Sequence, residues 1–174
     1  MKAYFVTNDQ RYSRFFLWLF NTDSSHTGIG FNVNGYDFVV DCNKPYGKHY
    51  LLKQWLMKYR IVVTMDIKID AEKEAAIYDL AINRVVNKPY DMGAYYYGAY
   101  RGFLKKFLGI PLPKTNAWSV PDKWCCTELY AALADCFKDI GIPVDDLAFD
   151  AMSPEMIEME LRSRTSHMEN VTWS

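Results

Sequence analysis

The chain has 174 residues, half of them apolar, and a formal net charge of −1 at pH 7. This length suits a single domain over residues 1–174 with one hydrophobic core, because domains typically contain about 100 to 150 residues. The near-neutral charge offers neither the basic surface of a nucleic-acid-binding protein nor the polybasic segment of a membrane-surface protein, so no nucleic-acid partner is expected.

Alternating apolar residues predict strands, and the Asn34-Gly35 pair between two of them is a strong hairpin signal. The strands are expected at residues 2–7, 26–33, 36–42 and about 61–67, the last being the final main strand. Apolar residues at helical spacing predict helices. These are expected at about 10–20, 50–58, 71–86, 91–108, 126–140 and 153–164, with a loop over 109–122 and a loose tail after the last helix. Without repeats or long linkers, the elements should share one core in an α+β arrangement.

Cys126 is the leading candidate nucleophile. The apolar residues after it, at 129, 130, 133, 137 and 140, keep the spacing of a helix stripe, which places the thiol in the first turn on the buried face. First-turn N–H groups and the helix dipole stabilise a thiolate and a developing oxyanion. The alternative is a small core residue, which is the more common role of a buried cysteine.

A catalytic cysteine needs a base, and His26 is the best candidate because it stands where a polar loop enters the first strand of the hairpin. Asp41 lies at the end of the second hairpin strand. If the three residues converge, His26 would take the thiol proton and Asp41 would orient the imidazole. The alternative for Asp41 is an ordinary carboxylate at a strand end.

Four short motifs follow one another in a familiar order. They are His26-Thr27-Gly28-Ile29, Val39-Val40-Asp41, Tyr90-Asp91 and Trp124-Cys125-Cys126-Thr127-Glu128-Leu129. In this order the chain resembles the circularly permuted NlpC/P60 superfamily of papain-like cysteine hydrolases, and within it the YiiX-like proteins. Threonine follows the nucleophile where serine is usual, and aspartate stands where glutamate is more common.

The resemblance implies a papain-like domain with its core at about residues 3–140, in which an antiparallel sheet packs against the helix that bears the nucleophile. It also implies that Cys126, His26 and Asp41 form a catalytic triad. A substrate cleft is expected beside them, and its candidate residues are Trp124, Tyr90, Ser25 and Cys125.

The remaining cysteines have other expected roles. Cys125 points about 100° away from Cys126 on a helix and is interpreted as a capping neighbour, while Cys136 packs in the core and Cys42 faces away from Asp41 on its strand. A metal site made from His26 and three of the cysteines is conceivable. The chain lacks a Cys-x-x-Cys motif or a close histidine pair, so no metal or cofactor is expected.

The adjacent thiols Cys125 and Cys126 would strain if bridged to each other, which favours a reducing compartment. The first apolar run, residues 15–20, is too short to span a bilayer and lacks a signal-peptide cleavage pattern. A soluble, cytoplasmic protein without a transmembrane segment is therefore expected.

The sequence favours a cysteine hydrolase that acts on an amide bond in a peptide or a cell-wall peptide, or on a thioester or ester. Two alternatives stay open. One is a catalytically idle binding or accessory module with the same fold, and the other is a lipid acyltransferase of the LRAT-like type, which the missing membrane anchor and basic patch disfavour. The sequence carries no signal for an oligomeric state.

Overall fold

The structure is a computed structural model that describes the chain except for residues 112–114, 119, 121–122, 145, 148 and 150. Part of the expected 109–122 loop therefore lies outside the described residues. The strands are β1 (Lys2–Thr7), β2 (His26–Val33), β3 (Tyr36–Cys42), β4 (Gly47–Leu51), β5 (Arg60–Ile67) and β6 (Val171–Trp173). The helices are α1 (Arg11–Phe20), α2 (Leu52–Trp55), α3 (Ala71–Val85), α4 (Met92–Leu108), α5 (Glu128–Ala132), α6 (Ala134–Asp139) and α7 (Pro154–Thr165).

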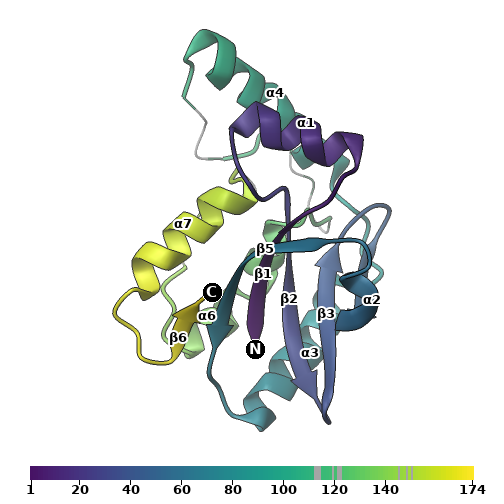
Figure 1. The fold of residues 1–174 in the computed structure, drawn as a ribbon, viewed down its shortest axis with the longest axis vertical. Coiled ribbons are helices and arrows are strands. Elements are labelled where there is room, and N and C mark those ends of the chain that lie inside the picture. The colour runs from purple at the N-terminus through teal and green to yellow at the C-terminus, as the bar shows by residue number, and fades with distance from the viewer. Residues whose placement is uncertain (112–114, 119, 121–122, 145, 148, 150) are drawn as a thin grey trace.

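Within the described residues, six antiparallel strands form one sheet in the order β4-β3-β2-β1-β5-β6 (Figure 1). The hairpin of β2 and β3 has the predicted bounds, and its turn contains Asn34 and Gly35, both with positive φ. Such a turn matches the twist of the two strands. The predicted α+β class is confirmed, with the sheet and the helices in one domain.

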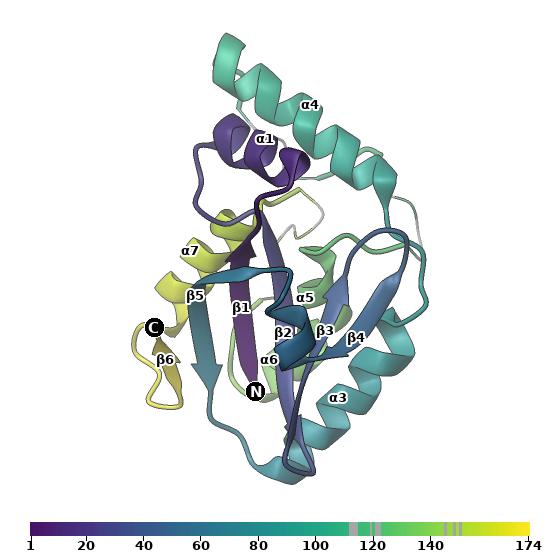
Figure 2. The same ribbon diagram turned by 45° about the vertical axis from the view of Figure 1, so that its right-hand side comes forward.

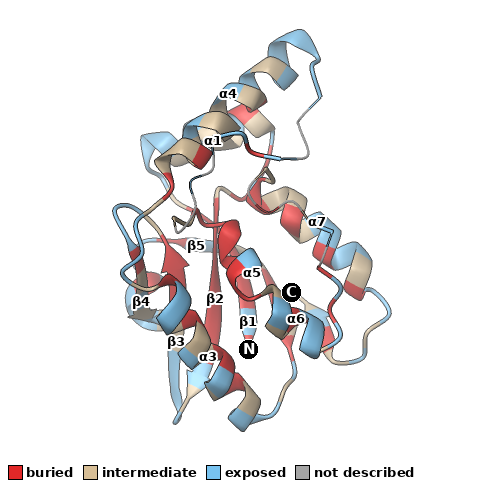
Figure 3. Ribbon diagram, turned by 180° about the vertical axis from the view of Figure 1, so that it is seen from behind, coloured by how far each residue is buried: buried red, intermediate tan, exposed pale blue. Residues whose placement is uncertain are grey.

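The main core lies on one face of the sheet. Alternation along the strands directs Phe5, Ile29 and Val40 to this face, where α3, α5, α6 and α7 cover them (Figure 3). The short helix α2 lies over the other face (Figure 2). Its last residue, Trp55, is fully buried there in a smaller cluster. Each strand of the hairpin therefore presents one set of side chains to the main core and the alternate set to the Trp55 cluster.

Two predictions about the sheet are wrong. Residues 50–58 do not form one helix, because Lys48 and Tyr50 pair with β3 and extend the sheet by the edge strand β4. The final residues are not a loose tail, since β6 pairs with β5 and the Trp173 indole donates to Thr165 Oγ1 at 3.1 Å. In both segments tertiary pairing overrides the local pattern.

The predicted helix over residues 126–140 is also wrong in detail. Its apolar spacing is present, but the chain leaves helical geometry at Leu133, with φ −114° and ψ 14°, which separates α5 from α6. Cys126 lies in the turn that leads into α5. The Glu128 carboxylate accepts from the backbone N–H of Cys125 at 2.7 Å, as the glutamate of a capping box does, and so fixes this turn.

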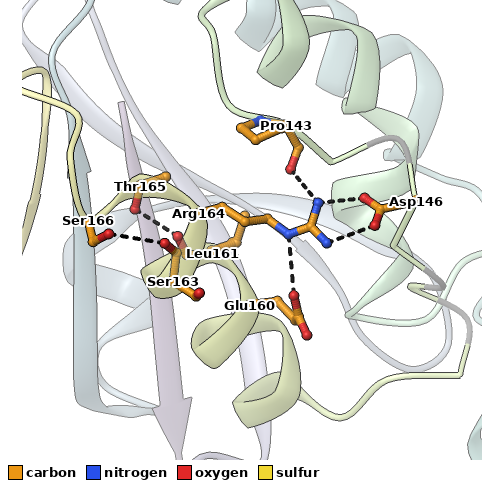
Figure 4. A network of polar contacts seen from close by, with 8 residues as sticks. All are labelled: Pro143, Asp146, Glu160, Leu161, Ser163, Arg164, Thr165 and Ser166. Carbon is orange, nitrogen blue, oxygen red and sulfur yellow. Dashed lines mark hydrogen bonds and ion pairs between the residues drawn. The ribbon is translucent and has the colours of Figure 1, made fainter.

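Helix caps fix the other elements near the site. The Asp91 carboxylate accepts from Ala94 N–H at 3.0 Å at the start of α4, and Ser153 Oγ accepts from Met156 N–H at 3.3 Å at the start of α7. Both caps were predicted as helix starts. The far end of α7 is held by Arg164, which donates to the Pro143 carbonyl and pairs with Asp146 (Figure 4). These contacts tie α7 to the segment that follows α6.

Helices α1 and α4 pack against each other at one end of the sheet (Figures 1 and 2). The buried Gly102 of α4 makes this contact possible, because an added Cβ there would lie 2.6 Å from the Phe20 ring of α1. The pair leaves a cleft between itself and the ends of β2 and β3.

Candidate active site

His26 and Asp41 lie side by side at the end of the β2–β3 hairpin nearest α1. His26 begins β2 and Asp41 stands one residue before the end of β3, so antiparallel pairing brings their side chains to the same place. The distance between His26 Nε2 and Asp41 Oδ1 is 2.5 Å, and only 1% of Asp41 is exposed. The carboxylate therefore holds one nitrogen of the imidazole and fixes its orientation.

Cys126 faces the same imidazole from the turn before α5, and both residues line the cleft. Burial alone lowers the pKa of His26, but the charges of Asp41 and Cys126, and hydrogen bonds to both, raise this pKa to about 10. Because Nε2 is held by Asp41, Nδ1 is the ring nitrogen left for the thiol. The arrangement favours a protonated imidazole beside the Asp41 carboxylate.

Two aromatic residues that the sequence analysis did not assign to the site contact the His26 and Asp41 side chains. Trp55 Nε1 donates to Asp41 Oδ2 at 2.8 Å, so both oxygens of the buried carboxylate are hydrogen-bonded. The Tyr59 ring stacks on His26, with 5.0 Å between the centroids and 15° between the planes. These contacts restrict the rotation of the imidazole and exclude water from behind it.

The sequence did contain a signal for this packing. Gly28 and Gly30 alternate along β2 on the same face as His26, and a strand that lacks side chains on one face leaves space for a large neighbour. An added Cβ at Gly28 would lie 3.0 Å from the Trp55 ring, and one at Gly30 would lie 2.5 Å from the Tyr4 ring. The two glycines therefore mark where aromatic rings lie against the sheet.

Tyr130 of α5 positions the cysteine turn against the start of β2. Thr27 Oγ1 donates to the Tyr4 carbonyl at 2.8 Å, which leaves Thr27 Oγ1 to accept from the Tyr130 hydroxyl at 2.7 Å. Thr27 is the neighbour of His26, and Tyr130 follows Cys126 by four residues. One buried hydrogen-bonded chain thus sets the spacing between the segments that carry His26 and Cys126.

The other thiols differ from Cys126 in their surroundings. Burial, the Glu128 carboxylate and the neighbouring Cys126 raise the pKa of Cys125 well above its usual value, and its Sγ lies 3.1 Å from Thr127 Oγ1. Burial also raises the pKa of Cys42 and Cys136. All four cysteines are free thiols, and these three are expected to stay protonated at neutral pH.

Ser25, Tyr90 and Cys125 line the same cleft as His26 and Cys126. Trp124 does not line it. Its backbone forms a bridge with Tyr90, and its side chain packs against the main core. The expectation that Trp124 forms part of the cleft is therefore wrong, because the bridge turns the indole inward.

Aromatic residues of α1 and α4 form much of the opposite wall of the cleft, and they include Tyr12, Phe16, Phe20, Tyr95 and Tyr97. The Lys44 ammonium also borders the cleft and lies 4.2 Å from the centroid of the Tyr95 ring. The cleft thus combines a largely aromatic wall, a cation at its border and the Cys126–His26 pair.

The chain is similar in structure to a solved protein described as the metalloprotein YiiX from Escherichia coli O157:H7, DUF1105. The two share 18% sequence identity and a TM-score of 0.51 over 99% of this chain and 94% of that one. No protein-family model and no curated protein matches the chain. In the part of the chain that the structure describes, no group of three His, Cys, Asp or Glu side chains is arranged to hold a metal ion. By its architecture, this chain has a YiiX-like α+β fold.

Proposed function

We propose that the chain is a cysteine hydrolase of the permuted NlpC/P60 type, which forms an acyl-enzyme on Cys126. The observation that carries the proposal is the buried His26 imidazole, which is held by Asp41 at 2.5 Å and lines the cleft together with Cys126. The favoured substrate is an amide bond of a peptide or a cell-wall peptide.

In the proposed reaction the Cys126 thiolate attacks the carbonyl carbon of the substrate, and the His26 imidazolium gives its proton to the leaving nitrogen. This breaks the amide bond and leaves a thioester on Cys126. The neutral imidazole then takes a proton from water, which attacks the thioester and releases the acid. Asp41 keeps the imidazole in one orientation through both steps.

Alkylation at mildly acid pH tests the activated thiolate. Iodoacetamide should label Cys126 far faster than Cys42 and Cys136, and a His26→Gln variant should lose this advantage. Equal rates at all cysteines would contradict an activated nucleophile and favour an idle binding module with the same fold.

Intact mass spectrometry with ester and amide probes tests the acyl-enzyme itself. The adduct should be absent from Cys126→Ala and present in the matched variant Cys125→Ala. An adduct that persists in Cys126→Ala and disappears in Cys125→Ala would show that Cys125, and not Cys126, is the nucleophile.

A second candidate is hydrolysis or transfer of a long acyl chain from an ester or thioester. The aromatic wall of the cleft favours it, because apolar walls bind acyl chains by the hydrophobic effect. A series of thioesters of increasing chain length distinguishes the two. The ratio kcat/KM should rise with chain length for an acyl substrate, and stay level for an enzyme that recognises peptides.

A further inference from the structure

An exposed, largely aromatic surface spans α1 and α4, and none of its members lines the cleft. We call it the arm face, and its members are Phe15, Trp18, Phe103, Phe107 and Leu108. Each is 46% to 64% exposed. Ring centroids are 5.9 Å apart for Phe15 and Trp18, 6.0 Å for Trp18 and Phe107, and 4.6 Å for Phe103 and Phe107. Single exposed apolar residues are ordinary, but a connected patch across two helices indicates an interaction surface.

The same two helices are strongly basic. They contain five of the chain's 20 lysines and arginines and none of its 21 acidic residues. In α1, Arg11 and Arg14 share a helix face with Phe15 and Trp18, because these positions are three or four residues apart. The overall charge of −1 therefore conceals a local concentration of positive charge.

These cations have no acidic partners among the described residues. The ion pairs found there involve neither Arg11, Arg14, Lys105 nor Lys106. The Lys106 ammonium lies 3.9 Å from the centroid of the exposed Trp18 ring. The same ammonium donates a hydrogen bond to the Trp18 carbonyl. Cations without acidic partners, interleaved with half-exposed aromatic rings, match the interfacial region of a membrane, where rings insert and basic groups reach phosphates.

We propose that the arm face docks on the surface of an anionic lipid bilayer. The aromatic side chains would lie at the boundary between headgroups and acyl chains, and the basic side chains would contact phosphates. None of the helices in the described part of the chain is long and apolar enough to cross a bilayer, so the contact would be peripheral. A second copy of the chain is a poorer occupant, because it would bring Arg11, Arg14, Lys105 and Lys106 of both copies against each other.

Vesicle flotation of the full chain tests this proposal. Binding should be strong on vesicles of phosphatidylcholine mixed with phosphatidylserine, and at least about tenfold weaker on phosphatidylcholine alone, because each basic residue near an anionic surface adds to affinity. Raised salt should weaken binding to the anionic vesicles. No binding to either kind of vesicle, or equal binding to both, would overturn the proposal.

Substitutions separate the arm face from the rest of the surface. The double variant Lys105→Glu with Lys106→Glu should reduce binding to anionic vesicles by at least about tenfold, and Trp18→Ser should reduce it as well. The matched control is the double variant Lys53→Glu with Lys68→Glu, because both lysines are exposed elsewhere on the molecule. An equal loss in the control would overturn the assignment, and so would concentration-dependent dimerisation that Trp18→Ser abolishes.

Membrane docking does not depend on the proposed chemistry. A Cys126→Ala variant should float with anionic vesicles as the unaltered chain does, even though it cannot form an acyl-enzyme. Loss of labelling at Cys126 with intact flotation would therefore contradict the proposed function alone. Intact labelling without flotation would contradict the docking surface alone.

Discussion

The pH dependence of folding stability offers a quantitative test of the His26 site. The pKa of His26 rises from 6.5 to about 10 in the folded chain, against the opposing effect of its burial. At about 1.4 kcal/mol for each pH unit, this corresponds to roughly 5 kcal/mol of preference for the imidazolium. Because the folded pKa lies above the unfolded value, this stabilisation is fully present below about pH 6.5 and is lost as the pH approaches 10.

The perturbation is His26→Gln, which removes the titrating group and keeps a polar side chain. Urea denaturation of the unaltered chain and of this variant, at several pH values from 6.5 to 10, gives the difference in free energy of unfolding. We expect this difference to shrink by several kcal/mol as the pH rises, with a slope approaching 1.4 kcal/mol per pH unit.

His49→Gln is the matched control, because His49 is exposed on the same sheet and its Nδ1 lies 2.8 Å from the Tyr78 hydroxyl. That control shows what the loss of a histidine side chain away from the cleft does to the same measurement. A difference between the unaltered chain and His26→Gln that is constant from pH 6.5 to 10, or that grows with pH, would refute the charged His26–Asp41 pair.

Three further substitutions test the contacts that hold the site in place. The measurement for each is the change in the free energy of unfolding. Trp55→Phe removes the indole donor to Asp41 and should lower the stability by about 1.5 to 3 kcal/mol, the range for hydrogen bonds to charged groups. Tyr130→Phe should cost about 1 kcal/mol, because the hydrogen bond to Thr27 is lost. Gly28→Ala places a methyl group 2.9 Å from a valine methyl and 3.0 Å from the Trp55 ring, so it should cost about 1 to 3 kcal/mol. An unchanged stability in any variant would contradict the contact that it removes or crowds.

The elements that were predicted well are those specified by local sequence. The Asn34-Gly35 turn fixes the hairpin register, and that register alone brings His26 and Asp41 to neighbouring positions. Asp91 and Ser153 indicate helix starts in the sequence, because a cap depends on residues three positions apart. These features need no knowledge of distant parts of the chain.

What could not be predicted depends on partners far away in sequence. The edge strands β4 and β6 are short, and their pairing with β3 and β5 decides their conformation. The break at Leu133 interrupts an apolar pattern that is fully compatible with one continuous helix. Trp55 was assigned to a helix, but its contact with Asp41 depends on how that helix folds over the sheet. The basic residues of α1 and α4 could not be recognised as a cluster from the net charge, because net charge sums over the whole chain.

His26 and Cys126, the proposed base and nucleophile, come from segments that are a hundred residues apart, joined through the Thr27–Tyr130 hydrogen bond. The proton acceptor of Cys126 therefore exists only while α5 rests on the sheet. Denaturation would expose this thiol and at the same time leave it without its acceptor, whereas it would only expose the buried Cys42. At mildly acid pH, unfolding should thus slow the alkylation of Cys126 and speed that of Cys42. The alkylation rate of Cys126 should therefore be high only in the folded chain, and a misfolded chain should carry a thiol that reacts slowly.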